Sequence, residues 1–149
     1  MEVIRPIEMK DLSDLMDLGE EAFGDDRRSL NDYAVYASQG YQGLVLVDTG
    51  KESTDKRMRG TTWFGPHEDW IEIATLAVFS QYRGRGYARR LLRRALFLCE
   101  GNKFFLNVRL DNAAAIKLYE SEGFVKVAEI PAYYLDGAPA YRMEKLPQS

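Results

Sequence analysis

The alternation of apolar and polar positions along the chain predicts a mixed α/β protein. Alternating or continuously apolar runs predict seven strands, at 2–7, 43–48, 58–65, 70–79, 103–109, 124–130 and 140–146. Apolar residues at helical spacing predict four helices, at 10–23, within 24–40, at 88–99 and within 111–124. The order β-α-α-β-β-β-α-β-α-β-β therefore predicts a central sheet that is mostly antiparallel.

Capping and turn residues support two of the helix boundaries. Asp11 or Ser13 stands where the first helix begins, and Asp111 or Asn112 stands where the last one begins. Short polar side chains at these positions satisfy the unpaired amides of a first helical turn. Gly123 suits the left-handed conformation that ends many helices, so the last helix is expected to stop there.

Length and composition limit the class of protein. The 149 residues suit one domain that covers 1–149. One cysteine and one histidine allow neither an internal disulfide nor a usual zinc site, so we expect no metal. The apolar runs are too short to span a membrane and no signal peptide is recognisable, so we expect a cytoplasmic protein without a membrane partner.

An arginine-rich stretch with two glycines, QYRGRGYARRLLRRALFLC at 81–99, is the most unusual part of the sequence. Gly84 and Gly86 follow a predicted strand and open a predicted helix, and glycines without Cβ let a ligand approach the backbone closely. The amides and dipole at a helix start attract anions. With Arg83, Arg85 and Arg89 nearby, the loop is a candidate site for a phosphate or pyrophosphate.

Four interpretations of this stretch compete. A P-loop is excluded because the string G-x-x-x-x-G-K-[ST] is missing, and a Rossmann fingerprint is disfavoured because Arg89 stands where a third small residue belongs. Nucleic-acid binding is not expected, because the basic residues form one cluster in a chain of net charge −3. A solvated helix face suits Arg90, Arg93 and Arg94 but leaves the two glycines unexplained.

The fourth interpretation is coenzyme A, and it rests on a family resemblance. Gln81, Gly84, Gly86 and Ala88 form the pattern Q-x-x-G-x-G-x-A, which resembles the pyrophosphate loop of the GNAT acetyltransferase superfamily. The segment 107–124 resembles the superfamily's following strand and helix. The resemblance covers essentially the whole chain and implies the GNAT fold, with helices on both faces of a mixed sheet and a splayed strand pair that binds acyl-CoA.

The resemblance also implies acetyl-CoA as co-substrate, without a metal, and a set of residues that bind it. The backbone of 76–78 is implied to pair with the pantetheine and to stabilise the oxyanion of the reacting thioester. The implied cofactor-binding residues are Leu76, Ala77, Val78, Gln81, Arg83, Gly84, Arg85, Gly86, Tyr87, Ala88, Arg89, Asn112 and Tyr119.

Two residues are candidates for proton transfer during acetyl transfer. Tyr119 lies two helical turns after Asn112, on the same helix side, and the resemblance implies that it acts as general acid toward the departing thiolate. A core aromatic is the alternative for Tyr119, and a simple N-cap is the alternative for Asn112. Glu72, five residues before Ala77 on one strand, is the candidate base, and a partly exposed strand glutamate is the alternative.

Three further residues are weaker candidates for chemistry. Asn107 stands in LNVR, where the ribosomal-protein alanine branch has a glutamate base in LEVR, and an amide cannot take that proton. His67 lies in a predicted polar turn and is expected to be an ordinary loop histidine. Cys99 falls on the apolar face of the arginine helix, which favours packing over nucleophilic chemistry.

The acceptor side is suggested by the C-terminal segment and the first helix. Tyr133 and Tyr134, before an Asp-Gly turn, resemble the tyrosine pair that helps clamp the peptide in protein N-terminal acetyltransferases, and Phe23 is expected on the opposite wall. Adjacent strand residues point to opposite faces, so we expect at most one tyrosine to line the cleft. Asp25 and Asp26 either attract a cationic amine or are solvated turn residues.

The sequence therefore predicts an acetyl-CoA-dependent N-acetyltransferase in which a primary amine attacks the thioester directly. The leading acceptor is a peptide or protein N-terminal amine, and a lysine side chain or a small amine is the alternative. A non-catalytic acyl-CoA sensor on the same fold is a further alternative, which Tyr119 disfavours because a sensor needs no general acid.

Overall fold

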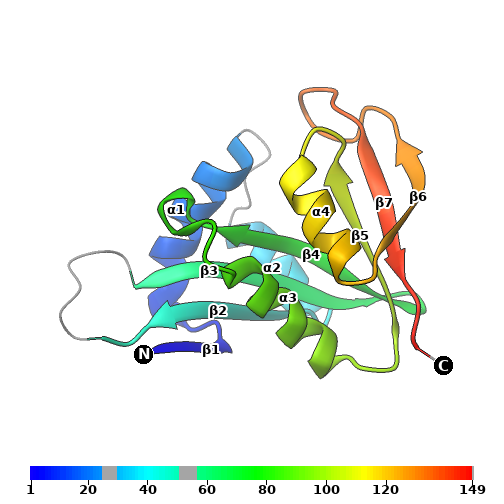
Figure 1. Cartoon of the computed structure of the whole chain (residues 1–149). Coiled ribbons are helices and arrows are strands. Elements are labelled where there is room, and N and C mark those ends of the chain that lie inside the picture. Colours follow the sequence, from blue (N-terminus) through cyan, green and yellow to red (C-terminus); the bar gives the residue numbers. More distant parts are fainter. Residues whose placement is uncertain (25–29, 51–56, 149) are drawn as a thin grey trace.

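A seven-stranded sheet runs through the computed structural model, which describes residues 1–24, 30–50 and 57–148 (Figure 1). Its strand order is β1-β2-β3-β4-β5-β7-β6, and only β4 and β5 pair in parallel. The strands are β1 (Glu2–Pro6), β2 (Gln42–Asp48), β3 (Met58–His67), β4 (Trp70–Val78), β5 (Lys103–Arg109), β6 (Val125–Ile130) and β7 (Ala140–Lys145). The predicted element order and the mostly antiparallel sheet are confirmed.

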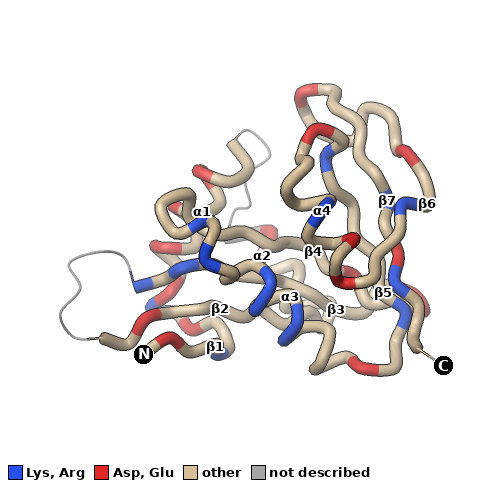
Figure 2. Tube along the Cα trace, in the orientation of Figure 1, with Lys and Arg blue, Asp and Glu red and all other residues tan. Residues whose placement is uncertain are grey.

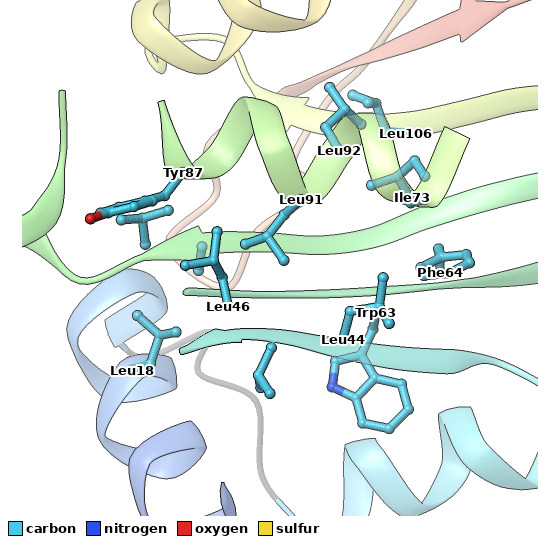
Figure 3. Close-up of a cluster of buried hydrophobic side chains, with 14 of the residues drawn as sticks. Leu18, Leu44, Leu46, Trp63, Phe64, Ile73, Tyr87, Leu91, Leu92 and Leu106 are labelled. Atoms are coloured by element: carbon cyan, nitrogen blue, oxygen red, sulfur yellow. The ribbon is translucent and has the colours of Figure 1, made fainter. Parts of the chain in front are cut away.

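The helices cover both faces of the sheet. They are α1 (Leu12–Phe23), α2 (Leu30–Ser38), α3 (Tyr87–Leu98) and α4 (Ala113–Ser121). Figure 3 shows α3 on one side of β2–β4 and α1 and α2 on the other. Among the helices of the described residues, none is long and apolar enough to cross a membrane.

The core lies between these layers, with the side chains of Figure 3 at its centre. Leu18 from α1 and Leu91 from α3 are each at most 1% exposed and lie on opposite sides of the sheet, and Phe64 in β3 is also fully buried. Full burial of such a side chain stabilises the fold by roughly 1.5–3 kcal/mol. The apolar positions that predict the elements are therefore the ones that hold the layers together.

The parallel pair β4 and β5 separates after a short contact. Pairing covers only three positions and ends at Glu72 opposite Phe105. Just beyond this point β4 contains a register shift against β3, and the Thr75 hydroxyl accepts the Trp63 amide at 3.0 Å where the regular ladder is interrupted. Bulges of this kind bend a strand and often lie beside functional sites. The result is a split in the sheet between 73–78 and 106–109.

Local details differ from the prediction at three positions. Strand β3 extends through His67, so the turn occupies only 68–69, where Glu68 has φ +56°. The Asp11 carboxylate does not cap α1, because it accepts the Glu8 amide at 2.8 Å and a two-point contact from Arg5. The apolar face predicted for the helix at 88–99 does not include Leu98, although this residue follows the same helical spacing: it is 49% exposed in the last turn of α3. The Asn112 cap is confirmed: its side chain accepts the Ala115 amide at 3.1 Å.

Candidate active site

Two adjoining cavities lie at the split between β4 and β5. We call the first the glycine-loop cavity: it has a volume of about 510 Å³ and is lined by the end of β4, the loop before α3, the first turn of α3, and α4. We call the second the tyrosine cavity: it has a volume of about 460 Å³ and is lined by β4, β5, α4 and the loop before β7. Both have the size of a small-molecule site. They share Ala22, Phe23, Leu76, Asn112, Ala115 and Tyr119.

The glycine loop has the backbone shape of an anion site. Gly84 and Gly86 have φ +80° and +81°, a region that residues with a side chain rarely occupy, and the space where a Cβ would stand is open at both. Gly86 is the N-cap of α3, and its carbonyl accepts the Arg90 amide at 3.1 Å. The amides of 87–89 therefore precede the first complete turn and have no partner within the helix. Together with the helix dipole they favour a bound anion.

The arginines around this loop divide into two groups, and Figure 2 shows basic positions along α3 and the loop before it. Arg90 pairs with Glu2 at 2.8 Å and Arg93 with Glu122 at 2.6 Å, so these two belong to a surface held by ion pairs. Arg89 also contacts Glu122 at 2.8 Å but lines the glycine-loop cavity. Arg83 lines the same cavity and is exposed. The solvated-face interpretation therefore suits part of the cluster only.

Most residues that were predicted to bind the cofactor come together in the glycine-loop cavity. The exceptions are Gln81, in an exposed 3-10 turn, and Arg85, whose guanidinium carbon lies 5.6 Å from the centre of the Tyr82 ring. The predicted residues that line the cavity are Leu76, Ala77, Val78, Arg83, Gly84, Gly86, Tyr87, Ala88, Arg89, Asn112 and Tyr119. Sequence reasoning missed Tyr82, a buried wall residue whose only sequence signal is its place before the first glycine.

Tyr119 stands where the two cavities meet. Its side chain is 7% exposed and packs edge-on against Phe124, with ring centres 5.9 Å apart. Among the residues that the structure describes, its hydroxyl has no hydrogen-bond partner. Burial raises the pKa of the Tyr119 hydroxyl, and the nearby Tyr134 adds to the shift. The phenol therefore keeps its proton over the whole neutral range.

Glu72 lies beside the split without lining either cavity. It is half-buried, at the last paired position of β4 and β5, and its carboxylate accepts the Tyr41 hydroxyl at 2.7 Å. Tyr41 passes over Gly65, where a Cβ would lie 2.5 Å from the tyrosine ring, so the close approach needs glycine. Burial raises the pKa of Tyr41, and its hydrogen bond to Glu72 adds to the shift. The described lining of the tyrosine cavity holds no carboxylate.

Both Tyr133 and Tyr134 line the tyrosine cavity, so the prediction that at most one of them does so is wrong. The prediction assumed a strand, but the segment between β6 and β7 is a loop in which Ala132 has φ +50°. The amides of both tyrosines donate to the Ala138 carbonyl at 3.1 Å, which turns the chain back on itself. Their rings meet edge-on at 4.9 Å, and Phe23 at the end of α1 lines the same cavity.

The weaker candidates fall in different places. His67 packs edge-on against Phe105 at 5.6 Å, in strand β3, and does not line the described walls of either cavity. Cys99 is half-buried, and burial raises the pKa of its thiol, which suits packing rather than nucleophilic chemistry. Asn107 lines the tyrosine cavity. Asp25 and Asp26 lie outside the described residues. In the described part of the chain, no three His, Cys, Asp or Glu side chains are grouped to hold a metal ion.

Comparison with known proteins assigns the chain to one family. The sequence model of the acetyltransferase (GNAT) family matches residues 12–124, most of the chain. N-alpha-acetyltransferase RimI of Mycobacterium tuberculosis is 45% identical over 75 residues, which are 50% of this chain and 48% of that protein. The chain thus spans about half the length of the curated relatives it matches, or less.

Solved structures resemble the chain along its whole length. The ribosomal-protein-S18-alanine N-acetyltransferase from Escherichia coli superposes with a TM-score of 0.84 at 27% identity, covering 100% of this chain and 96% of that one. A chain of the NatC complex bound to Gag peptide and CoA superposes with a TM-score of 0.81 at 25% identity, covering 99% of both. The split sheet and its two cavities therefore occur in a fold that is shared with these proteins.

Proposed function

The chain belongs to the GNAT acetyltransferase family, and we propose that it transfers the acetyl group of acetyl-CoA to the N-terminal amine of a peptide or protein. The observation that carries the proposal is the pair of adjoining cavities that meet at Tyr119. One has the anion-binding backbone that a pyrophosphate requires, and the other has an aromatic wall suited to a peptide. The whole-chain similarity to a ribosomal-protein alanine acetyltransferase supports this acceptor class.

The glycine-loop cavity fits acetyl-CoA by the chemistry of its walls. In this proposal the amides at the start of α3 bind the pyrophosphate, with Arg83 at the rim, because they are unpaired within the helix and lie at the cavity. The split leaves one edge of β4 beyond Glu72 unpaired with β5, so its backbone is placed to pair with the amides of an extended pantetheine arm. A backbone amide at 76–78 would stabilise the thioester oxyanion, a contribution of about 2.7–4 kcal/mol per donor.

Tyr119 is proposed to assist the departure of the thiolate. A phenol with a raised pKa is a weaker acid than an alkyl thiol, for which a pKa of about 8.5 is usual. Complete proton transfer to the thiolate is therefore uphill, and the hydroxyl contributes mainly as a hydrogen-bond donor that strengthens as charge develops on sulfur. Its low exposure and its place at the junction of the cavities suit this role.

The amine must be neutral when it attacks, and Glu72 is the proposed base. Its carboxylate is next to the split and is held by Tyr41, so it would act through a bridging water rather than by direct contact. A peptide α-amine has a pKa of about 7.7–8.0, compared with about 10.4 for lysine, and is already partly neutral at pH 7. An α-amine thus depends less than a lysine amine on a base. This suits a site in which the candidate base, Glu72, does not line the cavity.

A screen of acceptors tests the proposal. Thiol release from acetyl-CoA is measured with short peptides that differ in residue one, with the same peptides blocked at the N-terminus but carrying lysine, and with small amines. We expect turnover with peptides that have a free N-terminus, at the ionic strength of the cytoplasm. Turnover only with blocked lysine peptides or with small amines would reject the N-terminal amine and identify that amine as the acceptor. Acetyl-CoA binding without any turnover would favour the acyl-CoA sensor.

A further inference from the structure

We propose that Arg109 and Asp136 form a clasp that positions Tyr134 against the acceptor peptide, an inference that rests on the proposed function. Arg109 is the last residue of β5, at the open end of the split, and lines the tyrosine cavity. Asp136 lies in the loop between β6 and β7, 27 positions further along the chain. The clasp therefore joins the wall of the split to the loop that carries the aromatic residues.

The contact between the two side chains has the geometry of a two-point arginine–carboxylate pair. The Arg109 Nη2 donates to Asp136 Oδ2 at 2.7 Å and Nη1 donates to Oδ1 at 3.3 Å. Nε donates to Asp111 Oδ1 at 3.3 Å, which fixes the guanidinium plane from the other side. A planar fork held at three points has one orientation, and lysine does not reproduce it.

The fixed guanidinium of Arg109 contacts the ring of Tyr134. Its central carbon lies 4.8 Å from the centre of the Tyr134 ring, within the range of a cation–π contact. On the loop side, Asp136 Oδ1 accepts the Ala138 amide at 2.9 Å, and the Gly137 amide donates to the Tyr134 carbonyl at 2.9 Å. Asp136 therefore stabilises its own turn and also holds the Arg109 guanidinium. Together these two contacts fix the position of the Tyr134 ring.

The clasp acts on position more than on stability. The Arg109 and Asp136 side chains are 31% and 55% exposed, and ion pairs at that exposure contribute little to folding. Arg109 lowers the pKa of the Asp136 carboxyl, so the pair stays charged throughout the neutral range. What the pair changes is the place of Tyr134, and so the fit of a peptide in the tyrosine cavity.

Asn107 gives the neighbouring tyrosine a similar, weaker support. It lies two residues before Arg109, on the same face of β5, and its Nδ2 donates to the Tyr133 hydroxyl at 3.4 Å. Two of the three β5 residues that line the tyrosine cavity, Asn107 and Arg109, are therefore in contact with the aromatic pair. An asparagine at this place is a positioning residue rather than a base.

The test compares Arg109→Gln with a matched arginine on β7, opposite Asn107, that lines neither cavity among the described residues. Arg142 pairs with Glu144 at 2.8 Å and lies 4.0 Å from the centre of the Phe105 ring, so Arg142→Gln removes the same kinds of contact elsewhere on the sheet. We expect Arg109→Gln to raise the peptide KM about tenfold, with a much smaller change in kcat and in the acetyl-CoA Kd. Arg142→Gln should leave the peptide KM unchanged. Equal effects of the two variants on peptide KM would overturn the clasp.

A double-mutant cycle and amide exchange complete the test. Asp136→Asn should raise the peptide KM by a similar factor, and the double variant should be no worse than either single variant, because both remove one contact. Effects that multiply in the double variant would contradict the clasp. Hydrogen exchange over 131–138 should accelerate in Arg109→Gln and in Asp136→Asn but not in Arg142→Gln. Faster exchange there, without peptide turnover by the wild-type protein, would keep the clasp and reject the proposed acceptor.

Discussion

The glycine-loop cavity and the tyrosine cavity share Tyr119 and a wall of β4, but one is formed largely by backbone groups and the other by side chains. The first is made largely of backbone: two glycines with positive φ, the first amides of α3 and the unpaired edge of β4. The second is made of side chains from α1, β4, β5, α4 and the loop before β7. A site of backbone groups constrains the sequence locally, whereas a site of side chains is assembled from segments far apart in the chain.

This difference has a functional consequence. Backbone donors recognise a phosphate or an extended arm whatever the neighbouring side chains are, so that cavity can stay the same while the acceptor changes. In the proposed function, acceptor choice depends on the residues that line the tyrosine cavity, such as Tyr133, Tyr134 and Phe23, and on contacts such as the Arg109–Asp136 pair. We expect substitutions in the first cavity to abolish cofactor binding, and substitutions in the second to change the acceptor preference.

Tyr119, one of the six residues shared by the two cavities, should give the largest effect. Tyr119→Phe deletes only a hydroxyl and keeps the ring that packs on Phe124. Loss of the hydrogen-bond donor to the thiolate should lower kcat by about 10²–10³-fold, while the acetyl-CoA Kd from calorimetry changes little. Since that hydroxyl has no partner among the described residues, the thermal midpoint should not fall. Wild-type activity in this variant would reduce Tyr119 to a core residue.

The backbone site should give the next effect. Gly86→Val places a β-branched residue at φ +81° and fills the open space through which an anion would approach. Loss of the charge-assisted contacts proposed between the first amides of α3 and the pyrophosphate should weaken acetyl-CoA binding by at least about 100-fold in calorimetry.

Gly101→Val is the matched control for this variant. Gly101 has φ +91° and equally open space, but it lies in the turn after α3 and lines neither cavity among the described residues. It should lower the thermal midpoint by a similar amount and leave acetyl-CoA affinity unchanged. Near-normal affinity in Gly86→Val would reject the glycine loop as the pyrophosphate site.

The contrast between the two cavities also explains how much the sequence could predict. The strands and helices follow from apolar periodicity, and Gly84, Gly86 and Asn112 are recognisable because each meets a local backbone need. The orientation of Tyr133 and Tyr134 was mispredicted, because the loop that turns at Ala132 and closes on Ala138 depends on contacts with β5. Neither the Tyr41–Glu72 nor the Arg109–Asp136 contact leaves a local signal, since each joins segments about 30 residues apart.

A variant in the tyrosine cavity should produce a smaller and different effect. Tyr134→Ala removes a ring that rests on Arg109 and lines the tyrosine cavity. We expect the peptide KM to rise about tenfold while the acetyl-CoA Kd is unchanged. Tyr133→Ala should raise it less, because Tyr133 is 44% exposed and only weakly held by Asn107. If neither substitution changes peptide KM, a small-amine acceptor becomes the better hypothesis.

The smallest effect is expected at Glu72, which is beside the split rather than in it. At pH 7 a peptide α-amine is already roughly one-tenth neutral, so loss of a base costs at most about tenfold there. Glu72→Gln, which can still accept the Tyr41 hydroxyl, should lower kcat/KM at pH 7 and recover fully near pH 9, as the free amine becomes abundant.

The pH profile of Glu72→Gln is interpretable because Tyr41, Tyr119 and Asp136 keep their charge states in this range. The pKa values of Tyr41 and Tyr119 are raised, so both stay protonated. The pKa of Asp136 is lowered by Arg109, so the clasp is complete above the usual carboxyl pKa and is lost only as pH falls through the lowered value. If the kcat/KM of Glu72→Gln divided by that of the wild-type protein stays constant from pH 6.5 to 9.5, Glu72 takes no part in proton transfer. The amine would then have to enter in its neutral form, which favours α-amines over lysine.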